Sequence, residues 1–305
     1  MEVTSSLSVE RSSRSVRSIL RDIVALAKPR ITFMVLVTMG GGMGLAVRHD
    51  PAANLTLPTA LFALLGTGLI VAGANALNMY IEREIDGRMD RTKDRPLPTG
   101  RLSAKTALVF GIATSAAAVP ILAVFVNITT ALFAVLANLI YVLAYTPLKQ
   151  RSQHALLVGA VPGAIPPLLG YTAATGSVSL IALVLFGVMF FWQIPHFLAI
   201  ALFRKGDYAR AGLVVTPNVI GDRDTIHSMI RYSIVLTVVS LLLVPLHAAN
   251  MLYGVSALVL GGGFIAISAA GLWVDRFSVK KWARSAFAVS ILYVVGLFAA
   301  LMVGG

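Results

Sequence analysis

The sequence reads Asn78-Met-Tyr-Ile-Glu82-Arg-Glu-Ile-Asp86-Gly-Arg-Met-Asp90 where a long apolar segment ends, and a cluster of cations follows at once. Asn78, Glu82, Asp86 and Asp90 recur every four residues. Side chains at this spacing lie on roughly one side of an α-helix, because each step of four residues turns by only about 40°. The stretch therefore predicts a helix that leaves an apolar layer with a row of oxygen atoms on one side.

Such a row of side chains can hold a hard cation. Carboxylate oxygens are ligands that Mg²⁺ prefers, and bound Mg²⁺ favours phosphate oxygens as its remaining ligands. The cations Arg91, Lys93 and Arg95 suit direct contacts with the phosphate. An ordinary charged loop would explain these cations but not the acids, which contribute little to membrane topology, nor Asn78, which is costly at membrane depth. The row predicts a diphosphate–Mg²⁺ site.

The composition is that of a protein with several membrane spans. The chain has 305 residues, of which 57% are hydrophobic and 12% are charged, and its mean hydropathy is +0.84. The absence of cysteine excludes disulfides, thiolate metal sites and cysteine nucleophiles.

Nine segments are apolar and close to the roughly 20 residues that cross a bilayer. They cover residues 31–47, 57–80, 104–126, 129–148, 154–173, 178–203, 229–249, 252–274 and 282–303. The sequence therefore predicts an all-α polytopic membrane protein with nine transmembrane helices.

The distribution of positive charge orients these spans. With the N-terminus in the cytoplasm, 24 of the 25 Lys and Arg residues lie inside and only Arg48 lies outside. This agrees with the rule that cytoplasmic loops carry the positive charge, and nine spans then place the C-terminus outside. The net charge of +12 follows from this topology and requires no nucleic-acid partner.

Residues 1–27 form a basic segment ahead of the first span. A mitochondrial transit peptide is Arg- and Ser-rich and poor in acids, whereas a basic helix can also lie on the anionic cytoplasmic leaflet. Glu10 and Asp22 interrupt the segment and favour the surface helix, and with it a bacterial inner membrane. We expect this cytoplasmic segment to precede one transmembrane domain, residues 28–305. The basic residues at helical spacing are Arg11, Arg14, Arg17 and Arg21.

Two further polar groups follow the fourth and sixth spans. In Tyr145-Thr-Pro-Leu-Lys149, the lysine can pair with a diphosphate and the tyrosine can donate a hydrogen bond to it. The alternative is an interfacial tyrosine beside a snorkelling lysine. In Arg204-Lys205-Gly-Asp207, the carboxylate can hold a second Mg²⁺ or can anchor the loop through ion pairs.

The sixth span contains the aromatic stretch Phe190-Phe-Trp192-Gln193-Ile-Pro-His196-Phe. This setting suits a planar tetrapyrrole, with the imidazole as an axial ligand to its iron. Alternatively, the histidine and glutamine of a proline-kinked helix hydrogen-bond to neighbouring helices. The residues alone leave both interpretations open.

These motifs resemble those of the UbiA superfamily of intramembrane prenyltransferases along nearly the whole chain. The resemblance rests on Asn78-x₃-Glu82-x₃-Asp86, on Tyr145-x₃-Lys149 and on the loop at Asp207. The superfamily's first motif usually opens with Asp where this chain has Glu82, and its second usually has paired aspartates where only Asp207 is in register. A narrower resemblance, to the branch that farnesylates haem, rests on residues 86–96, 163–171, 192–197 and 207–212.

The resemblance implies nine helices around a central cavity that opens to the lipid bilayer. It implies farnesyl diphosphate and haem b as substrates, haem O and diphosphate as products, Mg²⁺ as cofactor, and a downstream haem A synthase or oxidase assembly as partner. We expect catalysis by Asn78, Glu82, Asp86, Asp90, Tyr145 and Lys149; metal binding by Glu82, Asp86, Asp90 and Asp207; diphosphate binding by Arg91, Lys93, Arg95, Arg204 and Lys205; and haem binding by Trp192, Gln193 and His196.

Two other functions stay open at this point. An enzyme of the same type that prenylates an aromatic quinone precursor would need no iron ligand. A transporter would place its binding groups near the bilayer midplane in broken helices, whereas the acids here cluster at the ends of spans.

Overall fold

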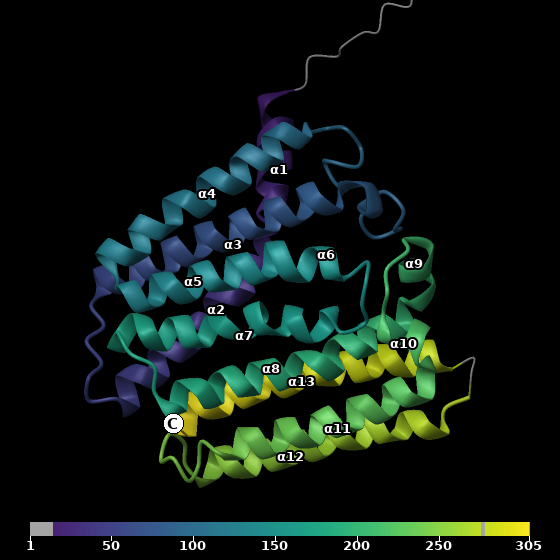
Figure 1. The fold of residues 1–305 in the computed structure, drawn as a ribbon. Helices are drawn as coiled ribbons and strands as arrows, with labels where there is room; N and C mark the ends of the chain where they lie inside the picture. The colour runs from purple at the N-terminus through teal and green to yellow at the C-terminus, as the bar shows by residue number, and fades with distance from the viewer. Residues whose placement is uncertain (1–14, 276–277, 305) are drawn as a thin grey trace, which may run out of the picture.

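Long α-helices make up the protein in the computed structural model, which describes residues 15–275 and 278–304 (Figure 1). Within these ranges there is no β-strand, and the predicted all-α class is confirmed. The elements are α1 (Val16–Leu26), α2 (Pro29–His49), α3 (Leu57–Asp86), α4 (Ala104–Phe125), α5 (Ile128–Leu139), the π-helix η1 (Ile140–Tyr145), α6 (Thr146–Leu148), α7 (Ala155–Thr175), α8 (Leu180–Phe203), α9 (Lys205–Arg210), α10 (Thr216–Val219), α11 (Gly221–Leu241), α12 (Met251–Ala270), the 3₁₀ helix η2 (Gly271–Trp273) and α13 (Val279–Gly304).

Among the described residues, eight helical segments are long and apolar enough to cross a membrane, and they coincide closely with eight of the nine predicted spans. The ninth long helix, α11, overlaps the predicted span at 229–249 but is shifted toward the N-terminus: it begins at Gly221 and ends at Leu241. Its first turn holds Asp222 and Asp224, and acids are favourable at the positive end of a helix dipole. Hydropathy alone missed this polar first turn and therefore placed the helix too late in the chain.

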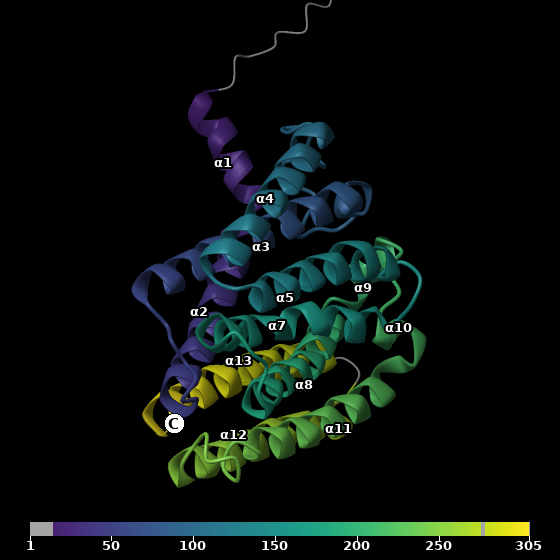
Figure 2. The ribbon, with the colours of Figure 1, turned by 60° about the vertical axis from the view of Figure 1, so that its left-hand side comes forward.

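Most helices pack against helices that are close to them in the sequence. Two pairs, α2 with α7 and α8 with α13, bring distant parts of the chain together. Figures 1 and 2 show them stacked side by side, with the short helices α6, α9 and α10 gathered at one end. We call this the polar end, formed by residues 86–103, 149–154 and 204–220. The loops that hold most of the predicted site residues therefore come together.

Helix α3 carries the first motif out of the apolar layer. Its 30 residues extend for roughly 45 Å, whereas the hydrocarbon core of a bilayer is roughly 30 Å thick. Thr56 caps its first turn by accepting a hydrogen bond from the backbone N–H of Thr59. The excess length places the last turns of α3, with Glu82 and Asp86, at the polar end.

Helix α1 is amphipathic and lies against α3. An ion pair of 3.1 Å joins its buried Asp22 to Arg101, and Leu26 is fully buried. Apolar side chains such as Leu20 and Val24 are exposed. The helical spacing predicted here is confirmed for residues 16–26, while Arg11 and Arg14 lie outside the described residues. Contact of this helix with the anionic leaflet stays a prediction.

The run Gly40-Gly-Gly-Met-Gly44 lacks the setting of a phosphate loop and predicts close helix packing. In the structure a Cβ on Gly42 would lie 2.0 Å from the carbonyl oxygen of Pro167 on α7, whereas a Cβ on Gly40 would meet nothing within 4 Å. The backbones of α2 and α7 therefore approach each other at Gly42, and only glycine permits this contact.

We expect Gly42→Ala to lower the free energy of unfolding by about 1–3 kcal/mol, because the added methyl group overpacks the contact. Gly40→Ala, two residues earlier on the same helix, should leave stability unchanged. Thermal unfolding of the detergent-solubilised protein measures both. Equal melting temperatures for the two variants would contradict the close approach of α2 and α7.

Candidate active site

A central cavity of about 510 Å³ lies between α2, α3, η1, α7 and α8. Apolar side chains such as Val35, Ile70 and Leu169 line much of it, while charged groups line the part near the polar end. The cavity thus has the mixed lining that a ligand with a long apolar tail and an anionic head requires.

Three buried side chains from the last turns of α3, Asn78, Glu82 and Asp86, line the charged part of the cavity. Their spacing of four residues places them on one side of the helix, as the sequence predicts. Each holds a cation from another part of the chain: Lys28 Nζ at 2.9 Å from Asn78 Oδ1, Lys149 Nζ at 2.6 Å from Glu82 Oε1 and Arg95 Nη1 at 2.6 Å from Asp86 Oδ2.

Positive charge exceeds negative charge along this wall. The charged residues lining the cavity are two carboxylates and four cations: Glu82, Asp86, Lys28, Arg91, Arg95 and Lys149. Burial, together with the positive charges of Arg95 and Lys149, lowers the pKa of Lys28 from 10.5 to about 7. An anion bound here would offset the repulsion among these cations.

Lys149 stays charged in the same surroundings. Burial lowers its pKa, whereas the hydroxyl of Tyr145 and the carboxylate of Glu82 raise it, and the balance lies above the ordinary value. Its ammonium lies 4.6 Å from the centre of the Tyr145 ring. Tyr145 and Lys149 therefore line the cavity as a contacting pair.

The carboxylate of Asp86 fits a metal ion. Its Oδ1 is buried and has no hydrogen-bond partner in the described part of the chain, which is costly unless a cation or donor fills the position. No three His, Asp or Glu side chains among the described residues form a complete metal cage. Mg²⁺ needs no such cage, because it commonly binds through one or two carboxylates, waters and the phosphates of a substrate. Glu82 and Asp86 meet that requirement.

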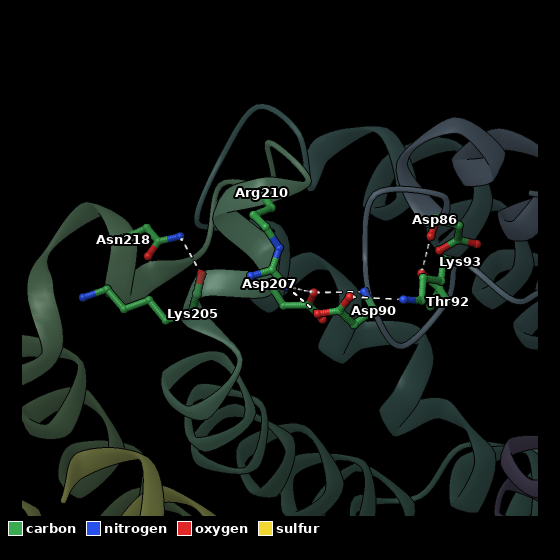
Figure 3. Close-up of polar contacts among 8 residues, drawn as sticks. All are labelled: Asp86, Asp90, Thr92, Lys93, Lys205, Asp207, Arg210 and Asn218. Carbon is green, nitrogen blue, oxygen red and sulfur yellow. Dashed lines mark hydrogen bonds and ion pairs between the residues drawn. The ribbon is translucent and has the colours of Figure 1, made fainter. Parts of the chain in front are cut away.

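Asp90 lies apart from the other three members of the row. Helix α3 ends at Asp86, so the chain turns before Asp90. The backbone N–H of Asp90 donates to Asp207 Oδ1 at 3.1 Å, and Arg210 contacts the carboxylates of Asp90 and Asp207 at 2.7 and 2.8 Å (Figure 3). Lys93 lies 3.6 Å from Asp90. The two acidic loops therefore meet, through ion pairs, beside the cavity lining and not within it.

Three predicted diphosphate ligands, Lys93, Arg204 and Lys205, also lie outside the lining. Lys205 pairs with Asp222 at 2.7 Å, and Figure 3 shows its side chain pointing away from Asp86 and Asp90. Arg204 lies over the ring of Phe203 at 5.8 Å. Arg91 and Arg95 do line the cavity. The roles of Lys93, Arg204 and Lys205 stay predictions.

Trp192, Gln193 and His196 on α8 line the cavity together. Gln193 Nε2 donates to the carbonyl oxygens of Met189 and Ala160, the latter on α7, at 2.9 and 3.3 Å. Trp192 Nε1 donates to a carbonyl oxygen of α13 at 2.6 Å. The stretch thus binds neighbouring helices and also faces the cavity, so the two interpretations left open by the sequence are compatible.

Lys28 is the principal site residue that the sequence analysis missed. It lies between α1 and α2 with a positive φ of 45°, which is uncommon for a residue other than glycine. The backbone carbonyl beside it, of Ala27, accepts a hydrogen bond from Asn75 at 3.3 Å. A cation next to a membrane span is expected from topology alone, so no sequence signal distinguished this one.

Comparison with known proteins identifies the family. Residues 34–303 match the UbiA prenyltransferase family. The chain is 50% identical over 281 residues to the protoheme IX farnesyltransferase of Sorangium cellulosum, covering 89% of this chain and 100% of that protein.

Two solved structures share the fold. Digeranylgeranylglyceryl phosphate synthase is similar with a TM-score of 0.79 at 16% identity, covering 94% of this chain and 98% of that one. A UbiA homolog from Archaeoglobus fulgidus, bound to DMAPP and Mg²⁺, is similar with a TM-score of 0.60 at 19% identity, covering 92% and 99%. The chain is therefore a multi-pass membrane protein that belongs to the UbiA prenyltransferase family.

Proposed function

We propose that the protein transfers the farnesyl group of farnesyl diphosphate to a vinyl group of haem b, giving haem O and diphosphate. The observation that carries this proposal is that one cavity is lined both by the charged side chains around Glu82 and Asp86 and by His196 with its aromatic neighbour Trp192. The relative from Sorangium cellulosum, named a protoheme IX farnesyltransferase and half identical to this chain, supports haem as the acceptor.

The cations hold the diphosphate and stabilise its departure. Lys28, Arg95 and Lys149 are fixed by ion pairs and hydrogen bonds before substrate arrives, so they need little reorganisation as negative charge develops on the leaving group. The C1–O bond of the allylic diphosphate then breaks, and its electron pair leaves with the diphosphate. Arg91, Lys93, Arg204 and Lys205 are proposed as further contacts around this group.

Glu82 and Asp86 are proposed to hold Mg²⁺, with Asn78 beside them and with Asp90 and Asp207 joining after their loops rearrange. When bound, the ion neutralises charge on the diphosphate oxygens as a Lewis acid. The role of Asn78 is to position Lys28 through the hydrogen bond that it accepts. Tyr145 directs Lys149 into the cavity through its ring contact.

The acceptor half of the reaction takes place beside α8. The electron pair of a haem vinyl group forms a bond to C1 of the farnesyl cation, which leaves a positive charge next to the porphyrin ring. Water adds to that carbon and loses a proton, so the product carries one farnesyl group and one hydroxyl group. Trp192, Gln193 and His196 supply the wall that orients the porphyrin.

The proposed location is the inner membrane of a bacterium, with the N-terminus in the cytoplasm and the C-terminus outside. The excess of Lys and Arg at the polar end supports this orientation. In the same orientation, the charged part of the cavity lies toward the cytoplasm. A downstream haem A synthase or an oxidase assembly factor is the proposed recipient of the product.

The test uses purified protein in lipid nanodiscs with haem b, farnesyl diphosphate and Mg²⁺, followed by mass spectrometry of the porphyrins. We expect a haem heavier by one farnesyl group and one hydroxyl group, and we expect EDTA to abolish it. Unchanged haem, from the same preparation that prenylates an aromatic acid, would overturn the choice of acceptor while keeping the reaction type.

Lys28 gives a separate prediction. We expect Lys28→Gln to raise the KM for farnesyl diphosphate roughly tenfold to a hundredfold, the loss typical of a hydrogen bond to a charged group. Arg30→Gln, two residues later and exposed, is the matched control and should leave the KM unchanged. Equal KM values for Lys28→Gln and the unaltered protein would show that Lys28 does not bind the diphosphate.

A further inference from the structure

The reaction proposed above does not use Ser290 on α13, yet this buried serine makes two short contacts beside the cavity. Its Oγ donates to the backbone carbonyl oxygen of Phe287 at 2.6 Å and lies 2.7 Å from Nδ1 of His196. His196 lines the cavity from α8, so the serine lies behind a cavity residue and not in the lining itself.

Counting protons assigns the tautomer of His196. A serine hydroxyl has one hydrogen, and here the carbonyl oxygen of Phe287 accepts it. Toward the imidazole, the hydroxyl oxygen can only accept. Nδ1 of His196 must therefore carry the hydrogen, and in a neutral imidazole Nε2 then keeps a free lone pair. Among the described residues none hydrogen-bonds to this second nitrogen.

The ring has little freedom to turn away from this arrangement. The centres of the Trp192 and Phe287 rings each lie 4.8 Å from the centre of the imidazole. Trp192 Nε1 also donates to the backbone carbonyl oxygen of Ser290 at 2.6 Å, which fixes α8 against α13 at the same residue. Flipping the ring would place a C–H group 2.7 Å from the serine oxygen. One orientation of the imidazole is therefore selected.

We propose that Ser290 is a positioning residue that holds His196 as its Nδ1–H tautomer, so that Nε2 is the axial ligand to the iron of haem b. This inference rests on the proposed function and specifies how the acceptor is recognised. A metal-ligating histidine commonly donates its other N–H to a fixed acceptor, which sets its tautomer and raises its basicity. Recognition through iron would also make the site prefer haem to the same porphyrin without a metal.

Binding measurements test the proposal without turnover. Haem b and metal-free protoporphyrin IX are titrated separately into the protein in nanodiscs, and the iron–histidine stretching vibration of bound ferrous haem is recorded by resonance Raman spectroscopy. We expect Ser290→Ala to weaken haem binding roughly tenfold to a hundredfold, as is typical when such a hydrogen bond to a metal ligand is lost. The vibration should shift to lower frequency, and binding of the metal-free porphyrin should not change.

Three further variants separate this role from a packing role. Ser290→Thr keeps the hydroxyl and should restore both haem affinity and vibration. Ser285→Ala, on the exposed side of the same helix, should leave both unchanged. His196→Ala should remove the iron–histidine vibration altogether. Binding of farnesyl diphosphate to each variant checks that the cavity still folds.

Two results would overturn the inference: an unaltered vibration and haem affinity in Ser290→Ala, or an iron–histidine vibration that persists in His196→Ala. Either result leaves the proposed function intact if the unaltered protein still makes haem O. Conversely, protein that binds haem with the expected vibration but makes no haem O would reject the proposed function and keep the inference.

Discussion

We expect Asp86→Asn to lower the rate of haem farnesylation roughly 10²–10³-fold, the size of effect found when a preorganised electrostatic group is removed from an active site. The position of Asp86 suits a metal ligand: Arg95 holds one carboxylate oxygen at 2.6 Å, and the other oxygen is buried without a hydrogen-bond partner among the described residues. The amide keeps the shape of the side chain but loses the negative charge that holds Mg²⁺. The loss should appear in kcat, since the diphosphate cations remain.

Asp94→Asn is the matched control for this variant. Asp94 lies in the same charged loop, but it is exposed and does not line the cavity. Its substitution should leave the rate unchanged. A rate for Asp86→Asn within threefold of the unaltered protein would remove this carboxylate from the chemistry, provided that Mg²⁺ is still required.

The second large effect is expected at the ion pair between Lys149 and Glu82. Lys149→Met leaves the Glu82 carboxylate buried without its partner, and breaking a buried pair in this way costs about 3–5 kcal/mol of stability. The variant should also lose most of its affinity for farnesyl diphosphate, because it loses a point charge that lines the cavity. Thermal unfolding and diphosphate titration measure these two losses separately.

A double variant separates stability from function at this pair. Glu82→Gln combined with Lys149→Met removes both charges, so stability should largely return, whereas activity should stay lost. Arg151→Ala, two residues further and exposed, serves as the control for removing a cation from this loop. A double variant as unstable as Lys149→Met alone would show that the ion pair is not what stabilises this part of the fold.

Much of the fold could be predicted because membrane spans have a strong hydropathy signal. Eight predicted spans agree closely with helices, and the first motif faces one side of α3 as its spacing requires. The span assigned to 229–249 was displaced because the charged first turn of α11 belongs to the helix but carries no hydropathy signal. Spacing also extended the row to Asp90, although the helix ends at Asp86.

The parts of the site that sequence could not provide are contacts between distant elements. Lys28 reaches Asn78 because the joint between α1 and α2 packs against α3, and Ser290 reaches His196 because α13 packs against α8. Neither Lys28 nor Ser290 belongs to a sequence motif that would mark it as a site residue. The meeting of Asp90 with Asp207 through Arg210 is likewise a contact between two loops that are far apart in the sequence, and neither loop alone indicates its partner.

The most direct test of haem farnesylation by this cavity is a competition in one reaction. Purified protein in nanodiscs receives farnesyl diphosphate, Mg²⁺ and equal concentrations of haem b and 4-hydroxybenzoate, and mass spectrometry follows both acceptors over time. We predict that farnesyl appears on haem, together with a hydroxyl group, and that the aromatic acid stays unmodified. Farnesylated aromatic acid beside unmodified haem would contradict the proposed function.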